Sequence, residues 1–383
     1  MKCIVCKSKL TNFFNLGNLP PSDYFAPSKI LAKNSPLFKL SVGRCKKCSL
    51  VQNEHLVSAN TRYKKLIYSY NSANSNYAKQ HWHDYTSSIS KLFKKNLKLL
   101  DIGCNDGYLL NLVQKKTKSN FIFGLDASPF QVYQSKKKYK KIKFSCGFAE
   151  NSSKIFKKNY FDIITFNNVF NHSSNPIKFL NQIRKILNEN GFIIIEVPDW
   201  IKTVKNKMWD QIYHEHTAYF TPYTISQTLH KAGFEITNLE NIDYHGGSMR
   251  IVASKNNNKI KRKKIYTNLS LKECKTLKNN AEIIKEKTLK KIASIKNKPI
   301  YLFGAPAKGN TLINYFGINY KNINACLETS KNKIGKFMPK SCIPIIAEKK
   351  IVKKEGYILN LSWNIPFVFK NFCNKTGLKI IKI

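Results

Sequence analysis

The chain is poor in acidic residues and has no long apolar run. It contains 22 Asp and Glu against 66 Lys and Arg in 383 residues, a formal net charge of +44. No stretch approaches the roughly 18 apolar residues of a membrane helix. Residues 1–10 carry cysteines and lysines instead of the apolar segment of a signal peptide. The sequence therefore predicts a cytoplasmic protein that does not contact a membrane.

The excess of positive charge has two interpretations. A large positive field attracts polyanions, which favours a nucleic-acid binder. The lysines, however, occur in nearly every segment, and no arginine-rich block or RNA-binding signature is present. We therefore expect a lysine-rich solvated surface and no nucleic-acid partner. An anionic small substrate such as a sugar nucleotide would also benefit from this field.

Four of the ten cysteines form two close pairs, Cys3-x-x-Cys6 and Cys45-x-x-Cys48. In a reducing compartment such pairs are typical of metal ligands before disulfides. Two such turns complete a tetrahedron around zinc, and four thiolates leave no position open for water. Residues 1–60 are therefore predicted to be a small module with a structural zinc; free or catalytic thiols are the alternative.

The rest of the chain has the pattern of α/β domains. Strands and helices alternate in residues 61–255, which predicts a parallel sheet covered by helices on both faces. Residues 256–298 form a lysine-rich connector, in which Ser270-x-x-Glu273 is a capping box that opens a long helix. Residues 299–383 begin a second series, with a strand at 299–303, a tight loop at 304–309 and a helix at 310–316.

A glycine loop follows the first strand of the larger domain, Leu100-Asp-Ile-Gly-Cys-Asn-Asp-Gly107. A dinucleotide fingerprint would require glycine where Asn105 and Tyr108 stand. The loop is instead similar to the first motif of class I S-adenosylmethionine (SAM) methyltransferases. Asp126 ends the next strand, where a carboxylate can accept hydrogen bonds from ribose hydroxyls. The expected cofactor-binding residues are Asp101, Gly103, Asn105, Asp106, Gly107, Asp126 and Asn167.

Two further motifs carry polar side chains. The loop Gly304-Ala-Pro-Ala-Lys-Gly-Asn-Thr311 is not a Walker A loop, because Asn310 replaces the lysine. It could still hold phosphate through backbone N–H groups and Lys308, although a plain Rossmann-like turn is the alternative. In Tyr213-His-Glu-His216 a proton acceptor lies beside a carboxylate and a phenol, which suits proton abstraction. If this segment is a strand, both histidines face one side and Glu215 the other.

Together these motifs resemble the deoxysugar C-methyltransferases of antibiotic and surface-polysaccharide pathways, of the tylosin 3-C-methyltransferase type. The resemblance also includes His245-Gly-Gly-Ser248-Met-Arg250, Lys333-x-Gly335 and Trp363-Asn364, and it covers nearly the whole chain. Glu328 stands where the family usually has aspartate. The resemblance implies an α/β protein with a class I SAM methyltransferase fold, a small N-terminal zinc module and a second, C-terminal Rossmann-like domain.

The implied reaction moves a methyl group from SAM to a carbon next to the keto group of a nucleotide-linked keto-deoxysugar. By resemblance His216 removes the α-proton and Glu215 orients it. Donors to the enolate oxygen are sought among Tyr213, His172, Tyr68 and Tyr70. The residues expected to line the substrate are Asn168, Ser72, His245, Gly246, Gly247, Lys308 and Asn310.

Three alternatives remain at this point. An O- or N-methyltransferase would share the SAM domain without α-proton removal. A nucleic-acid methyltransferase is suggested by charge, but Asn167-Asn-Val-Phe170 stands where a motif of the N-P-P-Y type for base amines would be. A non-catalytic binding protein would have the zinc module and the SAM fold without the methyltransferase activity. The sequence does not determine the oligomeric state, for which we favour a monomer, and gives His214 no role.

Overall fold

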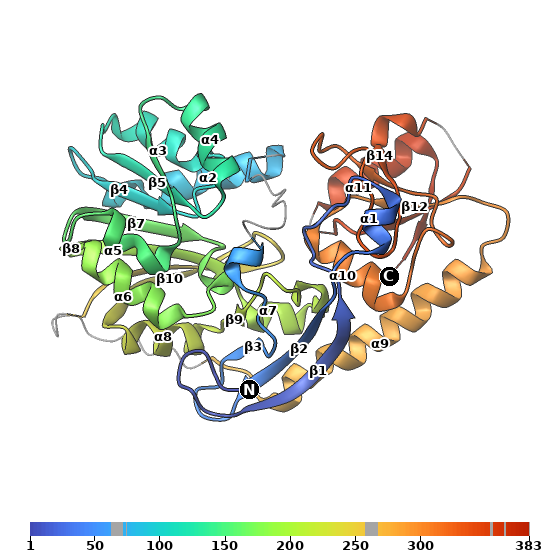
Figure 1. The fold of residues 1–383 in the computed structure, drawn as a ribbon, viewed down its shortest axis with the longest axis horizontal. Coiled ribbons are helices and arrows are strands. Elements are labelled where there is room, and N and C mark those ends of the chain that lie inside the picture. Colours follow the sequence, from blue (N-terminus) through green and yellow to red (C-terminus); the bar gives the residue numbers. More distant parts are fainter. Residues whose placement is uncertain (63–71, 74, 257–266, 353–354, 364, 383) are drawn as a thin grey trace.

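Two lobes form the molecule, and the N-terminal strands and one long helix run beneath both (Figure 1). The computed structural model describes residues 1–62, 72–73, 75–256, 267–352, 355–363 and 365–382. Tyr68, Tyr70 and Asn364 lie outside the described residues. Within that part of the chain, no helix is both long and apolar enough to cross a membrane.

The first lobe is built on a seven-stranded sheet with strand order β10-β11-β8-β7-β4-β5-β6. The strands are β10 (Phe234–Ile242), β11 (Ser248–Lys255), β8 (Leu187–Pro198), β7 (Phe161–Asn167), β4 (Leu99–Ile102), β5 (Ile122–Asp126) and β6 (Lys143–Cys146). All pairs are parallel except those of β11. The chain order reverses between β4 and β7, and this switch point is where ligands bind in such sheets.

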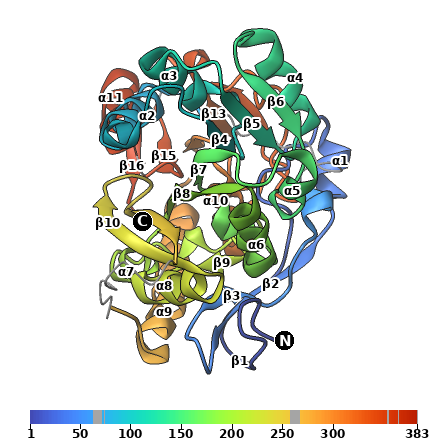
Figure 2. The same cartoon turned by 90° about the vertical axis from the view of Figure 1, so that its left-hand side faces the viewer.

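Helices cover both faces of this sheet (Figure 2). One face packs against α2 (Asn76–Ile89), α3 (Tyr108–Thr117) and α4 (Pro129–Lys138), the other against α6 (Pro176–Ile186) and α8 (Pro222–Lys231). In β8, Ile193 and Ile195 enter the core on one face and Ile194 the core on the other. This alternation follows from the two-residue period of a strand and explains the apolar run in the sequence. The short helices α5 (Ser152–Ile155) and α7 (Trp200–Lys205) complete the lobe.

The N-terminal module contributes three strands to a four-stranded sheet with strand order β1-β2-β3-β9. These are β1 (Leu10–Leu19), β2 (Phe38–Cys45), β3 (Val51–Asn53) and β9 (Ala218–Tyr219), and β9 comes from the first lobe. The module also reaches the second lobe near α1 (Lys29–Lys33), where Ala26 bridges to Phe337.

The second lobe is a five-stranded parallel sheet with strand order β14-β13-β12-β15-β16. Its strands are β14 (Ile345–Ala347), β13 (Ala325–Glu328), β12 (Ile300–Phe303), β15 (Tyr357–Asn360) and β16 (Lys379–Ile381), with helices α10 (Ala307–Phe316) and α11 (Pro366–Thr376). The connector helix is α9 (Leu271–Ser294), and the predicted capping box of Ser270 and Glu273 is confirmed.

The predicted loop at 304–309 is wrong in its second half. Helix α10 begins at Ala307, so Lys308, Gly309 and Asn310 lie in its first turn. The N–H of Gly309 donates to the Pro306 carbonyl, and Pro306 occupies the N-cap position with an extended backbone. Helix formation therefore uses backbone groups that the loop interpretation left available for phosphate.

Candidate active site

The four cysteines of the two pairs converge on one point. Their Sγ atoms all lie within 4.8 Å of one another, with Cys3 3.6 Å from Cys48 and Cys6 3.4 Å from Cys45. Four thiols at this spacing fit a tetrahedral zinc ion, which would have no open coordination position. The predicted metal ligands are thus brought together as a closed, structural type of site.

A cleft opens at the carboxyl ends of β4, β5 and β7, beside the switch point. Eight residues singled out from the sequence line it: Asp101, Gly103, Asn105, Asp126, Asn167, Asn168, His172 and Ser72. Gly103 has φ +70°, and a Cβ there would lie 2.3 Å from Val169 Cγ2. The backbone N–H groups of Asn105 and Ser128 donate to the Asp126 carboxylate at 2.9 and 2.8 Å. A tight glycine loop beside a fixed strand-end carboxylate fits SAM.

The glycine loop of residues 100–107 also binds Ser72, which the sequence predicted to line the substrate. The Ser72 hydroxyl donates to Asp106 Oδ1 at 2.6 Å, and its backbone N–H donates to Asn105 Oδ1 at 3.0 Å. Asp106 and Gly107 support the cleft without lining it. Sequence reasoning missed Trp82 and Phe148 as lining residues; Phe148 follows the end of β6, so the strand-end rule could have found it.

His216 lies in a turn and is buried, so the strand considered for residues 213–216 is wrong. Its Nδ1 is 2.9 Å from the Gln211 carbonyl oxygen and its Nε2 2.7 Å from the Tyr213 hydroxyl. A carbonyl oxygen only accepts, so Nδ1 carries the proton and Nε2 is the basic atom. Burial lowers the pKa of His216 to about 3, which keeps the ring neutral.

Glu215 does not orient His216 in this structure, because both ring nitrogens of that histidine have other partners. Burial, together with the nearby Asp23, raises the pKa of the Glu215 carboxyl to about 7. The orienting group is the Gln211 carbonyl. No sequence pattern could have identified it, because every residue has a carbonyl and only the turn selects this one.

His172 connects this turn to the cleft. It lines the cleft, and its ring centroid is 5.2 Å from that of His216. Arg62 donates to the carbonyl oxygens of both His172 (3.0 Å) and Glu215 (3.1 Å). Burial, together with the nearby Arg62 and the adjacent His216 ring, which disfavour a further positive charge, holds the pKa of His172 well below its usual range. Two neutral imidazoles therefore lie in succession at the edge of the cleft.

The second lobe meets the first beside this turn. Gln211 donates to the carbonyl of His245 at 3.2 Å, and a Cβ on the neighbouring Gly246 would lie 2.8 Å from Trp363. Lys308 Nζ is 3.3 Å from the centroid of the Trp363 ring, and burial lowers its pKa to about 8. Desolvation, Lys308 and other nearby groups lower the pKa of His245 to about 3.

Two expected substrate residues pack elsewhere. Asn310 is fully buried and donates to the Ser22 carbonyl at 2.6 Å, so its amide nitrogen holds the N-terminal module. Gly247 has φ +118°, and a Cβ there would meet the Lys202 side chain at 2.3 Å. Asn310 is therefore constrained by its contact with Ser22, and Gly247 by its close approach to Lys202.

Comparison with known families assigns all three parts of the chain. Residues 3–63 match a putative zinc binding domain, residues 75–239 a methyltransferase domain and residues 243–369 a C-methyltransferase C-terminal domain. The chain is a homologue of C-methyltransferases. It has a SAM-dependent methyltransferase domain with the α/β Rossmann-like fold and a zinc-binding module, as the sequence predicted.

Individual relatives of this C-methyltransferase homologue are distant. C-methyltransferase NovU of Streptomyces niveus is 25% identical over 231 residues, 56% of this chain and 55% of NovU. A ubiquinone biosynthesis O-methyltransferase of Pelagibacter ubique is 30% identical over 129 residues, 33% of this chain and 52% of that protein. The chain thus spans about half the length of the curated relatives it matches. The solved structure of a SAM-dependent methyltransferase from Aquifex aeolicus aligns with 44% of this chain and 88% of its own chain, at 16% identity. The TM-score of 0.38 is too low for this likeness to indicate more.

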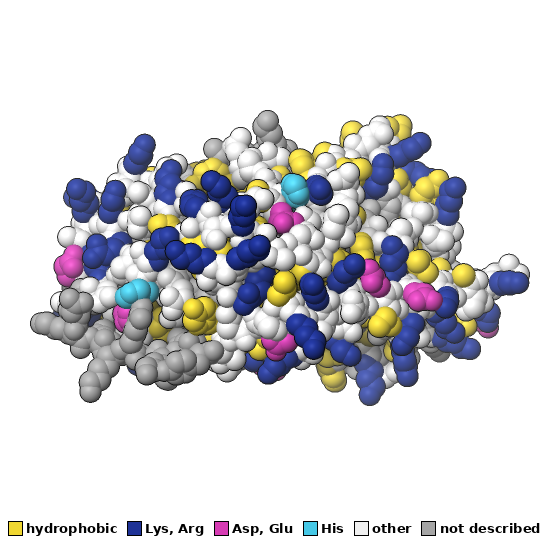
Figure 3. All heavy atoms as spheres, turned by 90° about the horizontal axis from the view of Figure 1, so that it is seen from below, with side chains coloured by type: hydrophobic (Ala, Val, Ile, Leu, Met, Phe, Trp, Pro, Cys, Tyr) yellow, Lys and Arg dark blue, Asp and Glu magenta, His cyan; other side chains and the backbone are white. Residues whose placement is uncertain are grey.

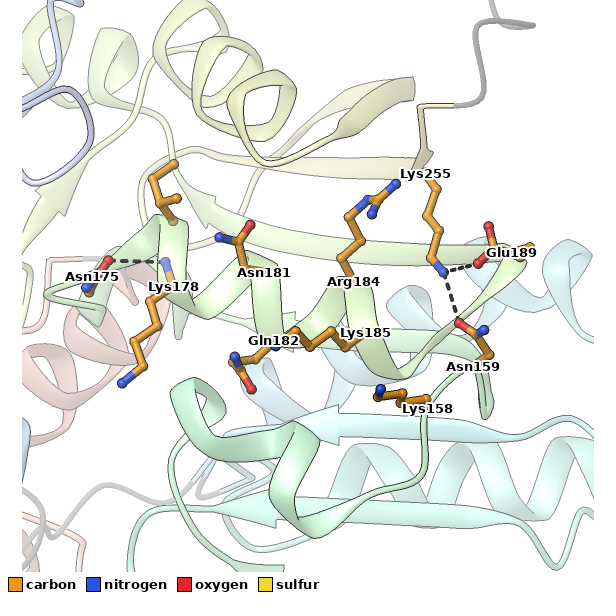
Figure 4. A pocket seen from close by; sticks show the side chains of 11 residues that line it. Lys158, Asn159, Asn175, Lys178, Asn181, Gln182, Arg184, Lys185, Glu189 and Lys255 are labelled. Carbon is orange, nitrogen blue, oxygen red and sulfur yellow. Dashed lines mark hydrogen bonds and ion pairs between the residues drawn. The ribbon is translucent and has the colours of Figure 1, made fainter.

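A second pocket of the homologue lies along α6 (Figure 4). Lysine and arginine side chains surround it, and Lys255 Nζ donates to Glu189 at 2.7 Å and to Asn159 at 3.2 Å. It contains no residue singled out from the sequence. Lysines and arginines are also scattered over the face drawn in Figure 3, so positive charge does not distinguish this pocket.

Proposed function

We propose that the chain transfers a methyl group from SAM to a carbon next to the keto group of a nucleotide-linked keto-deoxysugar, acting as a cytoplasmic monomer. One observation carries the proposal: the unprotonated Nε2 of the buried His216 lies one ring away from the SAM cleft. The matched C-methyltransferase C-terminal domain and the likeness to NovU support it. An O- or N-methyltransferase would not need to remove an α-proton.

The residues of the turn suit enolate formation. His216 Nε2 takes the α-proton, and the Gln211 carbonyl stabilises the imidazolium that results. Enolisation also needs a donor to the developing oxyanion, which is worth about 3 kcal/mol per hydrogen bond. The Tyr213 hydroxyl, 2.7 Å from Nε2, is the donor we assign to this role. SAM supplies the electrophilic methyl group that the enolate carbon attacks.

The second lobe supplies charge for the nucleotide part of the substrate. Lys308 lies beside His245 and is stacked on Trp363. With a pKa of about 8, most Lys308 side chains are protonated at pH 7. Bringing a phosphate to this buried ammonium would raise that pKa again.

The decisive experiment measures proton exchange and methylation separately. A panel of 4-keto sugar nucleotides is incubated in deuterated water with and without SAM. His216→Ala is expected to abolish both deuterium incorporation and methylation while SAM binding by calorimetry is retained. His230→Ala, at a half-exposed histidine paired with Glu235, is the matched control and should behave as wild type. Full activity of His216→Ala, or no exchange and no methylation with any of these sugars, contradicts the proposal.

Methylation of oxygen is the second candidate, because the chain also matches an O-methyltransferase over 129 residues. NMR of the product distinguishes the two, since carbon methylation creates a branched or quaternary carbon and oxygen methylation a methoxy group. Nitrogen methylation would be recognised in the same spectrum. Tight RNA binding that weakens steeply with salt would instead favour a nucleic-acid substrate.

A further inference from the structure

The turn that carries His216 is held from outside its own lobe. Strand β3 of the N-terminal module pairs with β9, which directly follows this turn (Figures 1 and 2). The backbone N–H of Asn53, the last residue of β3, donates to the Thr217 carbonyl at 3.0 Å. The module thereby continues as a sheet to the edge of the catalytic turn.

The Asn53 side chain spans the turn itself. Its Nδ2 donates to the carbonyl of Tyr213 at 3.0 Å and to the carbonyl of His216 at 2.8 Å. Its Oδ1 accepts from the Tyr219 hydroxyl at 3.2 Å. Asn53 is 1% exposed, so water cannot replace these bonds. The side-chain amide of Asn53 thus fixes both ends of the segment from Tyr213 to His216.

The preceding residue connects Asn53 to the cysteine cluster. Gln52 is fully buried, and its Oε1 accepts from the backbone N–H of Ile4, which lies between Cys3 and Cys6. Its Nε2 donates to the Asn53 carbonyl at 3.3 Å. On the other side, the N–H of Cys45 donates to the Leu50 carbonyl at 2.8 Å, next to the start of β3. Residues 52 and 53 therefore run from the zinc-type site to the catalytic turn.

We infer that Asn53 is a positioning residue for His216 and that the zinc module, through Gln52 and Asn53, sets the tautomer of the base. The inference rests on the proposed function only for its kinetic consequence. Asn53 holds the carbonyls of Tyr213 and His216 and so fixes the conformation of the turn. In this conformation the Gln211 carbonyl accepts a hydrogen bond from Nδ1 of His216. If the turn relaxes, Nδ1 loses that partner and the proton distributes between the two nitrogens.

The experiment compares Asn53→Asp with Asn18→Asp, the same change at an exposed residue of β1. A carboxylate cannot donate to two carbonyls, so only the first change should disturb the turn. The ring-nitrogen NMR signals of His216, assigned from the spectrum of His216→Asn, report the tautomer. In the wild type and in Asn18→Asp we expect a protonated Nδ1 and a bare Nε2. In Asn53→Asp we expect mixed tautomers and a loss of kcat of about 100-fold, with the Kd for SAM unchanged.

Unchanged His216 signals in Asn53→Asp overturn the inference, whatever its activity. If that variant does not fold, Asn53→Ala is measured instead. Zinc removal from the wild-type chain by a chelator is expected to produce the same change in the His216 signals, and unchanged signals in the metal-free protein overturn the coupling to zinc. If wild-type protein neither exchanges nor methylates any keto sugar, the proposed function fails, while the NMR comparison still decides the role of Asn53.

Discussion

Replacing Arg250 by methionine should destabilise the first lobe strongly, because it leaves a buried carboxylate without its partner. The guanidinium donates to Glu196 Oε2 from Nε at 3.1 Å and from Nη2 at 3.0 Å. The side chains of Glu196 and Arg250 are 0% and 5% exposed. His81, 2.8 Å from the other carboxylate oxygen, remains beside Glu196 in the variant.

The size of the effect follows from the burial of the pair. Breaking a buried ion pair on one side costs about 3–5 kcal/mol, a large part of the roughly 5–15 kcal/mol that stabilises a typical domain. At about 2–4 °C per kcal/mol for a domain of this size, the unfolding midpoint should fall by about 6–20 °C. Calorimetry and urea unfolding, each followed with and without SAM, measure the change.

Two variants make this measurement decisive. Lys290→Met breaks the exposed pair with Glu286 on α9 and is expected to leave the midpoint unchanged. The double variant Glu196→Met/Arg250→Met removes both charges and should recover most of the loss. If Arg250→Met and Lys290→Met have the same unfolding midpoint, the network of Arg250, Glu196 and His81 does not hold β8, β11 and α2 together. That result would refute the reasoning.

Three further changes have defined outcomes. Gly103→Ala places a methyl against Val169 at a positive φ and should abolish SAM binding by calorimetry, whereas Gly317→Ala, with open space around it, should not. Burial raises the pKa of Glu215 from 4.5 to about 7, so its contribution to stability is complete below pH 4.5 and falls as pH rises to 7. Relative to wild type, Glu215→Gln should therefore gain about 2.5 kcal/mol between pH 5 and pH 8, measured by urea unfolding; a constant difference contradicts this. Chelation of zinc should expose β1 and β2 to hydrogen exchange, and full protection without metal would exclude a structural zinc.

The sequence predicted those features that depend on local pattern. The glycine loop around Gly103 and the cysteine pairs each have a fixed spacing, and the structure brings these groups together as expected. The pairing of β9 with β3 could not be predicted from the sequence. A strand of two residues is too short to show an alternation of apolar and polar residues, and its partner strand lies over 160 positions away in the chain. The roles of Tyr68 and Tyr70 remain predictions.

The error at His216 has a different origin. The neighbouring Glu215 was the natural partner in the sequence, yet adjacent side chains need not face each other in a turn. The Gln211 carbonyl reaches Nδ1 because the chain reverses between them. The identity of a backbone acceptor depends on conformation alone, so only the structure could supply it.

The N-terminal module touches both lobes, and this limits how the two lobes can move apart. Ser22 accepts from Asn310 and Ala26 bridges to Phe337 in the second lobe, while β3 pairs with β9 in the first. A lobe attached only through α9 could swing freely about one end of that helix. With a second attachment some distance away, it can rotate only about the line that joins the two. Any widening of the space between the lobes must therefore occur about that one axis.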